Sequence, residues 1–94
     1  MESYRIIEEY IFTFNKLEHP VRAKISQSII IDNFSIESEK EYSLDFSHSY
    51  KPTKSAGFYH KSNVNNNIEK LYEDMILYIK GFEDCFDTEI NRYY

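Results

Sequence analysis

The chain of 94 residues contains few of the residues that cross-link small proteins or interrupt secondary structure. It has one cysteine (Cys85), two glycines, two prolines and no tryptophan. A single cysteine excludes an internal disulfide and indicates a reducing compartment. So few glycines and prolines argue against a disordered or loop-rich chain, and we expect one folded domain over residues 1–94.

Long apolar runs are also missing. No segment approaches the roughly 18 uninterrupted apolar residues that a membrane-spanning helix needs. Residues 1–4 do not begin the basic stretch and apolar run of a signal peptide. We therefore expect a cytoplasmic protein that makes no contact with a membrane.

Motifs for catalysis, phosphate binding and metal binding are absent from the sequence. The histidines and the cysteine are scattered, without the paired spacing of a zinc site: His19, His48, His60 and Cys85. Cys85 follows Glu83 and Asp84, whose negative charges would raise the pKa of a thiol and make it a poor nucleophile. We expect no enzymatic activity, no cofactor and no bound metal.

The most informative pattern in the sequence is a change of hydrophobic period near residue 63. Before it, apolar residues alternate with polar ones, as expected for a strand with one buried face. After it, they recur three and four residues apart, which is typical of an amphipathic helix. The apolar stripe of this helical region is predicted to comprise Val64, Ile68, Leu71, Met75, Phe82, Phe86 and Tyr93.

Three strands are expected in the first half. Residues 4–15 favour a strand because of their aromatic and β-branched content, although a helix over residues 4–17 is the alternative. In the strand, Glu8 is a misfit among the even-numbered apolar residues that would share one face: Tyr4, Ile6, Tyr10, Phe12 and Phe14. Residues 21–32 and 41–50 alternate clearly, with a turn ending at Pro20 and a polar connection over residues 33–40. Tyr50 would face inward and Ser47 and Ser49 outward.

The helical region begins after Asn66, whose spacing to Glu69 matches a capping box. A continuous helix over residues 67–92 and a pair of helices broken at Gly81 are both consistent with the pattern. We therefore predict an α+β fold, in which a three-stranded antiparallel meander is packed on one face by a long C-terminal helix or helix pair. A helix at residues 4–17 would instead give αββα or αβββα order.

The acidic residues concentrate in the C-terminal third. The net charge is −5, and residues 64–94 hold seven acidic and three basic residues. On one continuous helix, Glu69, Glu73, Asp84 and Asp87 would share a face opposite the apolar stripe. Such a face is either the solvated back of the helix or a row of charges that occupies a basic groove.

The loop of residues 48–61 is the second candidate region. It brings cations beside aromatic rings, a combination that suits an acidic protein surface or single-stranded nucleic acid. An ordinary solvated connection is the alternative. The residues we select as candidate contacts are Tyr50, Lys51, Lys54, Phe58 and Tyr59.

We expect a small acidic protein-binding module that acts by blocking a surface. The most specific hypothesis is an anti-CRISPR-like inhibitor, of the anti-defence type that a phage or mobile element would carry against a nucleic-acid-handling complex. An immunity or antitoxin-type protein, and a nucleic-acid module using the loop of residues 48–61, are the alternatives. Direct contact with nucleic acid is disfavoured by the acidic balance, and a homodimer is compatible with each hypothesis.

Overall fold

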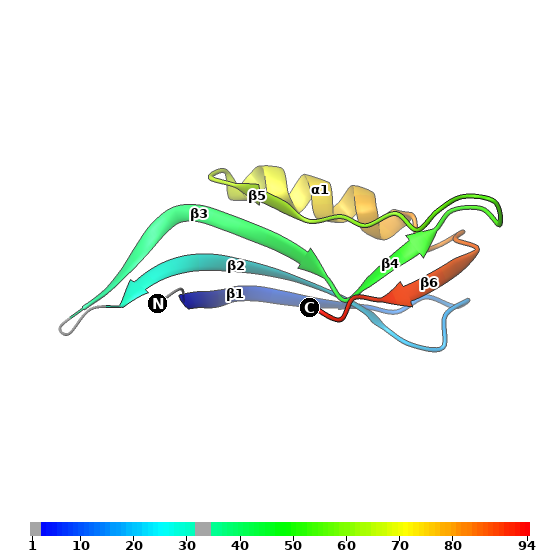
Figure 1. Ribbon diagram of the computed structural model, residues 1–94, viewed down its shortest axis with the longest axis horizontal. Coiled ribbons are helices and arrows are strands. Elements are labelled where there is room, and N and C mark those ends of the chain that lie inside the picture. Colours follow the sequence, from blue (N-terminus) through cyan, green and yellow to red (C-terminus); the bar gives the residue numbers. More distant parts are fainter. Residues whose placement is uncertain (1–2, 32–34) are drawn as a thin grey trace.

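The computed structural model describes residues 3–31 and 35–94, which form six strands and one helix (Figure 1). The elements are β1 (Ser3–Phe12), β2 (Val21–Ile31), β3 (Ile36–Phe46), β4 (His48–Lys51), β5 (Asn63–Asn65), α1 (Ile68–Lys80) and β6 (Asp87–Ile90). In those residues, β1, β2, β3 and β5 form a four-stranded antiparallel sheet in that order, and β4 pairs with β6. The α+β class is confirmed, with four strands in the main sheet where three were predicted.

The N-terminal segment is a strand, so the alternative helix over residues 4–17 is wrong. Its aromatic and β-branched residues suit an extended chain, and it pairs with β2 along its length. The polar turn before Pro20 then connects β1 to β2, as predicted.

The single apolar face predicted for the first strand is wrong, because β1 contains a β-bulge. The register shifts between Ile6 and Glu8, and the alternation of faces reverses there. Glu8 consequently lies opposite Ile25, on the face that is buried in β2, and the residues before the bulge change sides. The even-numbered residues therefore do not share one face. Tyr10 and Phe12 pack against the core, whereas Tyr4 and Ile6 are exposed.

The third predicted strand is divided into two. β3 begins at Ile36, inside the predicted connection, of which residues 33 and 34 lie outside the described residues. The chain leaves the main sheet at Ser47. The Ser47 hydroxyl accepts a hydrogen bond from the backbone amide of Arg22 (2.7 Å), and the Ser47 amide donates one to the Arg22 carbonyl (2.9 Å). Ser47 and Ser49 are consequently buried, where the alternation predicted that they face solvent.

The helix α1 is shorter than predicted and begins one residue later. The side chain of Asn67, rather than that of Asn66, caps it by accepting the amide hydrogen of Glu69 (3.0 Å). The helix ends at Lys80, and residues 87–90 form β6 instead of a further helix. Both the continuous helix over residues 67–92 and the helix pair are therefore wrong, because pairing with β4 holds the C-terminal segment in an extended conformation.

The predicted apolar stripe breaks up with the helix. Val64 lies in β5, and its side chain is exposed, as are those of Phe86 and Tyr93. Phe82, just beyond the helix, is fully buried because the chain turns back over the core. The stripe is thus real only over the thirteen residues of α1.

The core lies between α1 and the face of the main sheet that it covers. Aromatic rings extend the core toward the small sheet, with Phe46 and Tyr78 in contact at 4.3 Å between ring centroids. The buried apolar residues are Val21, Ala23, Ile25, Leu44, Phe46, Leu71, Met75, Tyr78, Ile79 and Phe82.

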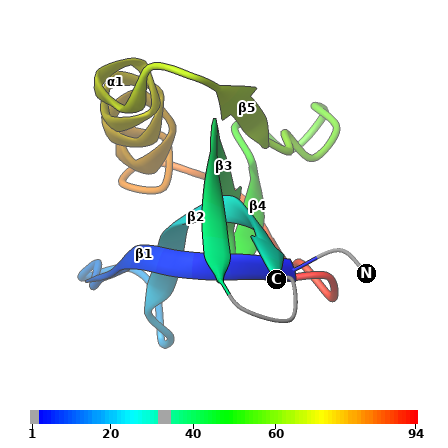
Figure 2. The ribbon, with the colours of Figure 1, turned by 90° about the vertical axis from the view of Figure 1, so that its left-hand side faces the viewer.

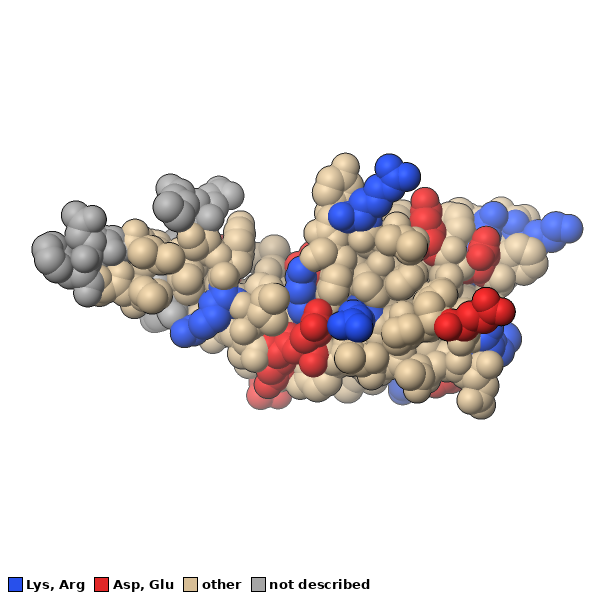
Figure 3. Space-filling model, turned by 90° about the horizontal axis from the view of Figure 1, so that it is seen from below, with Lys and Arg blue, Asp and Glu red and all other residues tan. Residues whose placement is uncertain are grey.

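The main sheet extends well beyond the helix. Figure 1 shows the N-terminal part of β1 and the connected ends of β2 and β3 projecting past α1, and the molecule measures 52 × 23 × 22 Å. We call residues 3–6, 28–31 and 36–41 the arm, and the remaining described residues the body. Seen end-on in Figure 2, α1 and β5 lie together above β1, and the view from below in Figure 3 shows the elongated shape.

In residues 3–31 and 35–94, no helix is long and apolar enough to cross a bilayer.

Candidate protein-binding surface

The side of α1 that points away from the sheet carries two large aliphatic side chains. Ile76 is 52% exposed and Leu77 is 68% exposed, whereas the opposite side of the helix is buried in the core. At 100° per residue, Glu69 and Glu73 lie on the same outward side, toward the N-terminal end. We call these four residues the outer face of α1. A helix packed on a sheet usually presents polar side chains there, so this surface is unusually apolar.

The charges near this surface are only partly balanced. Lys70 lies 3.8 Å from Glu73 and 3.5 Å from Asp74, so one cation serves two carboxylates. Asp74 is buried and also accepts a hydrogen bond from the side chain of Asn63, which ties β5 to the helix. Within the described residues Glu69 has no ion pair, and the outer face retains negative charge.

A small hollow adjoins the outer face. It has a volume of about 130 Å³ and lies between α1 and the segment that precedes β5. Tyr59, itself 46% exposed, forms one wall, and its carbonyl accepts a hydrogen bond from the hydroxyl of Tyr78 (2.6 Å). The hollow extends the apolar surface beyond Leu77, and its lining residues are Tyr59, Lys61, Asp74, Leu77 and Tyr78.

The other two predicted acidic residues lie away from the helix. Asp84 is in the turn that follows α1, and Asp87 begins β6 and accepts the amide hydrogen of Thr88 (2.8 Å). Both are exposed. The predicted single row of Glu69, Glu73, Asp84 and Asp87 along one helix is therefore wrong, and the structure divides it into two groups.

Tyr50 has a structural position in the loop region. Its ring packs against Phe82 (4.9 Å), Tyr78 (5.2 Å) and Tyr59 (5.6 Å), measured between ring centroids. Burial raises the pKa of Tyr50, and the neighbouring Tyr59 adds to the effect. Gly81 makes this packing possible, because a Cβ atom there would overlap the Tyr50 ring.

The remaining candidate residues of the loop do not converge on a site. The Lys51 ammonium lies 5.5 Å from the centre of the Phe58 ring, a cation–π contact that occupies both side chains. Lys54 is exposed at the loop end. Of the five predicted loop contacts, only Tyr59 borders the outer face of α1.

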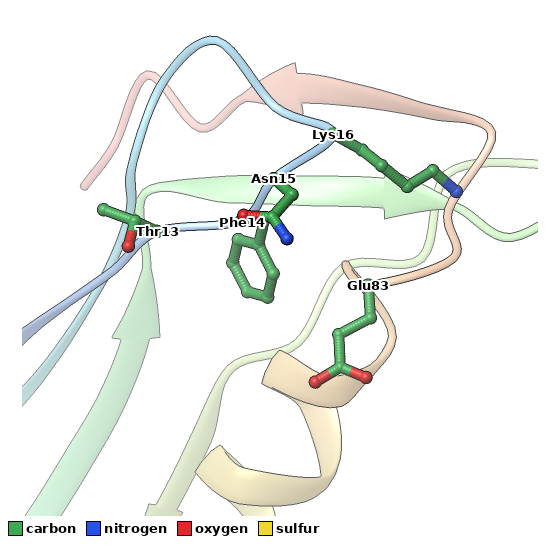
Figure 4. Close-up of a pocket in the computed structure, with 5 residues that line it drawn as sticks. All are labelled: Thr13, Phe14, Asn15, Lys16 and Glu83. Atoms are coloured by element: carbon green, nitrogen blue, oxygen red, sulfur yellow. The ribbon is translucent and has the colours of Figure 1, made fainter.

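A larger hollow lies at the far end of the body, between the β1–β2 connection and the turn after α1. Its volume is about 370 Å³, and Figure 4 shows that the Lys16 ammonium and the Glu83 carboxylate point in different directions. The Phe14 ring packs on Phe82 (5.9 Å between centroids). The residues that line this hollow include no nucleophile paired with a base. They are Thr13, Phe14, Asn15, Lys16 and Glu83.

The titratable groups elsewhere in the body have structural contacts. His19 and His48 stack at 4.3 Å between ring centroids, and burial, followed by the charge of His19, lowers the pKa of His48. Burial raises the pKa of the Cys85 thiol, and Asp87 and Asp84 add to the effect. In the part of the chain that the structure describes, no three His, Cys, Asp or Glu side chains gather as metal ligands.

The sequence did not point to the polar contact that joins β1 to the helix. The hydroxyls of Tyr10 and Tyr72 both donate to the carboxylate of Glu8, and these hydrogen bonds lower the pKa of that carboxyl. The strand alternation had marked Glu8 as a misfit. That misfit was the available signal, because a polar residue on an apolar face requires a partner.

Ile76 and Leu77 were also overlooked by the sequence patterns. Both lie off the apolar stripe of the helix, and their position there was a readable signal of an exposed apolar surface. Searches against protein-family models, curated proteins and solved structures found no match to this chain.

Proposed function

We propose that this chain is a non-enzymatic protein-binding module that docks on its partner through the outer face of α1. The observation that supports the proposal is the exposure of Ile76 and Leu77 side by side on that helix. Burying two large aliphatic side chains against a partner contributes about 1.5–3 kcal/mol each when the burial is complete. Contiguous exposed apolar surface with a polar border often marks an interaction site on a protein.

The charges indicate the chemistry of the partner. Glu69 and Glu73 flank the aliphatic pair, and Asp84 and Asp87 add exposed carboxylates beyond the end of the helix. A matching surface would have an apolar centre bordered by lysine or arginine side chains. This supports the more specific proposal that the partner is a nucleic-acid-handling protein whose basic surface the chain blocks.

An affinity pull-down from a lysate of the source or host cell, with and without nuclease, tests the proposal. We expect a stoichiometric protein partner that survives nuclease treatment. Capture that is lost entirely on nuclease treatment would instead favour the loop of residues 48–61 and nucleic acid. If the single partner is a toxin without a nucleic-acid-handling role, the result would favour an immunity or antitoxin-type protein over an inhibitor.

Substitutions locate the contact. Leu77→Ser is expected to weaken binding by about tenfold or more, because side chains near the centre of an interface contribute most of the affinity. Ile36→Ser is the matched control, since Ile36 is similarly exposed (65%, against 68% for Leu77) but lies on the arm. Equal effects of the two substitutions would contradict docking through α1.

Charge reversal tests the acidic component separately. Glu69→Lys with Glu73→Lys is expected to slow association and to weaken binding most at low salt. Glu18→Lys with Glu41→Lys changes the net charge equally at exposed positions outside α1 and serves as the control. Binding that is unchanged by the first pair would refute the blocking of a basic surface.

A further inference from the structure

The outer edge of β1 is a ten-residue strand edge without a pairing partner among the described residues. β1 stands at one end of the main sheet, and it contains no proline. The opposite end of the sheet is β5, which is only three residues long. A long edge with free amide and carbonyl groups is a template for pairing with another chain.

The bulge in β1 determines which residues can face each other across such an edge. Pairing with β2 places Arg5 opposite Gln27 and Glu8 opposite Ile25. Gln27 and Ile25 are two residues apart in one strand, so Arg5 and Glu8 share the covered face of the sheet. Tyr4, Ile6 and Glu9 lie on the opposite face by the same argument.

We propose that a second copy of this chain pairs with β1 in antiparallel orientation, about a two-fold axis located between Ile6 and Ile7. Residues whose numbers sum to 13 then lie opposite one another. Arg5 of each copy faces Glu8 of the other, on the same face of the extended sheet. The two copies would form one continuous antiparallel sheet, with the isologous contact expected of a two-fold dimer.

This register is favoured by both charge and apolar contact. Ile6 of each copy faces Ile7 of the other at the axis, and the two Arg5–Glu8 pairs flank this apolar centre. Within each copy the Arg5 guanidinium donates a hydrogen bond to the side chain of Gln27 (2.5 Å), and the Glu8 carboxylate accepts hydrogen bonds from the hydroxyls of Tyr10 and Tyr72. These contacts hold both charged groups on the covered face of the sheet. A shift by two residues in one direction places Ser3 opposite Glu8, and a shift in the other places Ile6 opposite Glu9. Both shifts lose the charge pairs.

The inference does not depend on the proposed function, because it concerns β1 and not the outer face of α1. Sedimentation equilibrium over a range of protein concentrations measures the association directly. We expect a reversible dimer. A protein that remains monomeric up to millimolar concentration would overturn the proposal.

Cysteine cross-linking tests the register in a Cys85→Ser background. Ile6 and Ile11 are both 58% exposed, so they form a matched pair of sites. In the proposed register, Ile6→Cys lies beside its counterpart, whereas Ile11→Cys is separated from its counterpart by nine residues, about 30 Å. We expect an intermolecular disulfide from Ile6→Cys alone. Equal cross-linking of both variants, or of Ile11→Cys alone, would overturn the register.

Charge exchange gives an independent test of the Arg5–Glu8 pairs. Arg5→Glu is expected to weaken the dimer about tenfold, because two attractive pairs become repulsive. Glu8→Arg should do the same, and the double variant should restore dimerisation to within about threefold. Circular dichroism shows whether each variant is folded. Failure of a folded double variant to recover would contradict the pairing.

Discussion

The arm and the body of this molecule use the same strands but bury them very differently. In the body, Val21 and Ile25 of β2 are fully buried beneath α1, as is Leu44 of β3. In the arm, Ile30 and Ile31 of the same β2 are about half exposed, and Ile36 of β3 is more so. One hydrophobic strand thus contributes a core at one end and an exposed apolar surface at the other.

The lengths of the elements explain this contrast. A helix of thirteen residues is about 20 Å long, whereas a strand of eleven residues spans about 37 Å. The helix α1 can therefore cover only about half of β2 and β3. The uncovered half therefore retains exposed apolar side chains.

Truncation of apolar side chains is expected to give the largest difference between the body and the arm in the free energy of unfolding. Phe82→Ala removes a fully buried ring in the body, and we expect a loss of about 3–5 kcal/mol in the free energy of unfolding. Ile36→Ala on the arm should change it by less than about 0.5 kcal/mol. Urea denaturation followed by circular dichroism measures both variants. A comparable loss from Ile36→Ala would show that the arm is buried in solution.

Substitution of Gly81 is expected to disturb the packing of the body. Gly81→Ala places a Cβ atom against the Tyr50 ring, which three other aromatic rings hold in place, and overpacking of this kind costs about 1–3 kcal/mol. Gly57 has open space around its Cβ position, so Gly57→Ala is the control and should not destabilise the protein. Thermal denaturation compares the two. An unchanged melting temperature for Gly81→Ala would argue against this contact.

The start of the helix, and so the extent of the covered region, depends on its cap. Asn67→Ala removes the acceptor for the amide of Glu69 and is expected to cost about 1 kcal/mol. Asn66→Ala, one residue earlier, is the control and should have little effect. Chemical denaturation distinguishes the cap seen in the structure from the cap that the sequence pattern indicated. A larger loss from Asn66→Ala would reverse the assignment.

The smallest effect is expected from pH, at the end of the body farthest from the arm. The folded-state pKa of His48 lies below its ordinary value of 6.5, so the unfolded chain binds the proton more readily. The stabilising contribution of neutral His48 to the free energy of unfolding is therefore fully present above pH 6.5. It decreases as the pH falls through that value, because the unfolded chain takes up the proton first. His48→Gln should reduce the difference in unfolding free energy between pH 7.5 and pH 5. Identical pH profiles for wild type and His48→Gln would contradict this.

The fold class followed from local patterns that depend on few residues. Alternation over residues 21–31 identified β2, and the spacing of Leu71 and Met75 identified the helix, because both patterns place apolar side chains on one face. The candidate site was predicted less well. The predicted residues Glu69 and Glu73 belong to the outer face of α1, and Tyr59 borders it. Ile76 and Leu77 were not selected, because the candidate residues were chosen for charge and aromatic character.

The sequence by itself determined the types of β2, β3 and α1, the approximate position of α1 and the surplus of acid in the C-terminal third, and it favoured a strand for β1. Only the tertiary structure decided where the elements end. Ser47 leaves the main sheet because Arg22 offers it backbone and side-chain hydrogen bonds, and residues 87–90 are extended because β4 supplies a partner strand. Contacts between residues distant in the chain select among local conformations of similar energy, and hydrophobic periodicity does not record them.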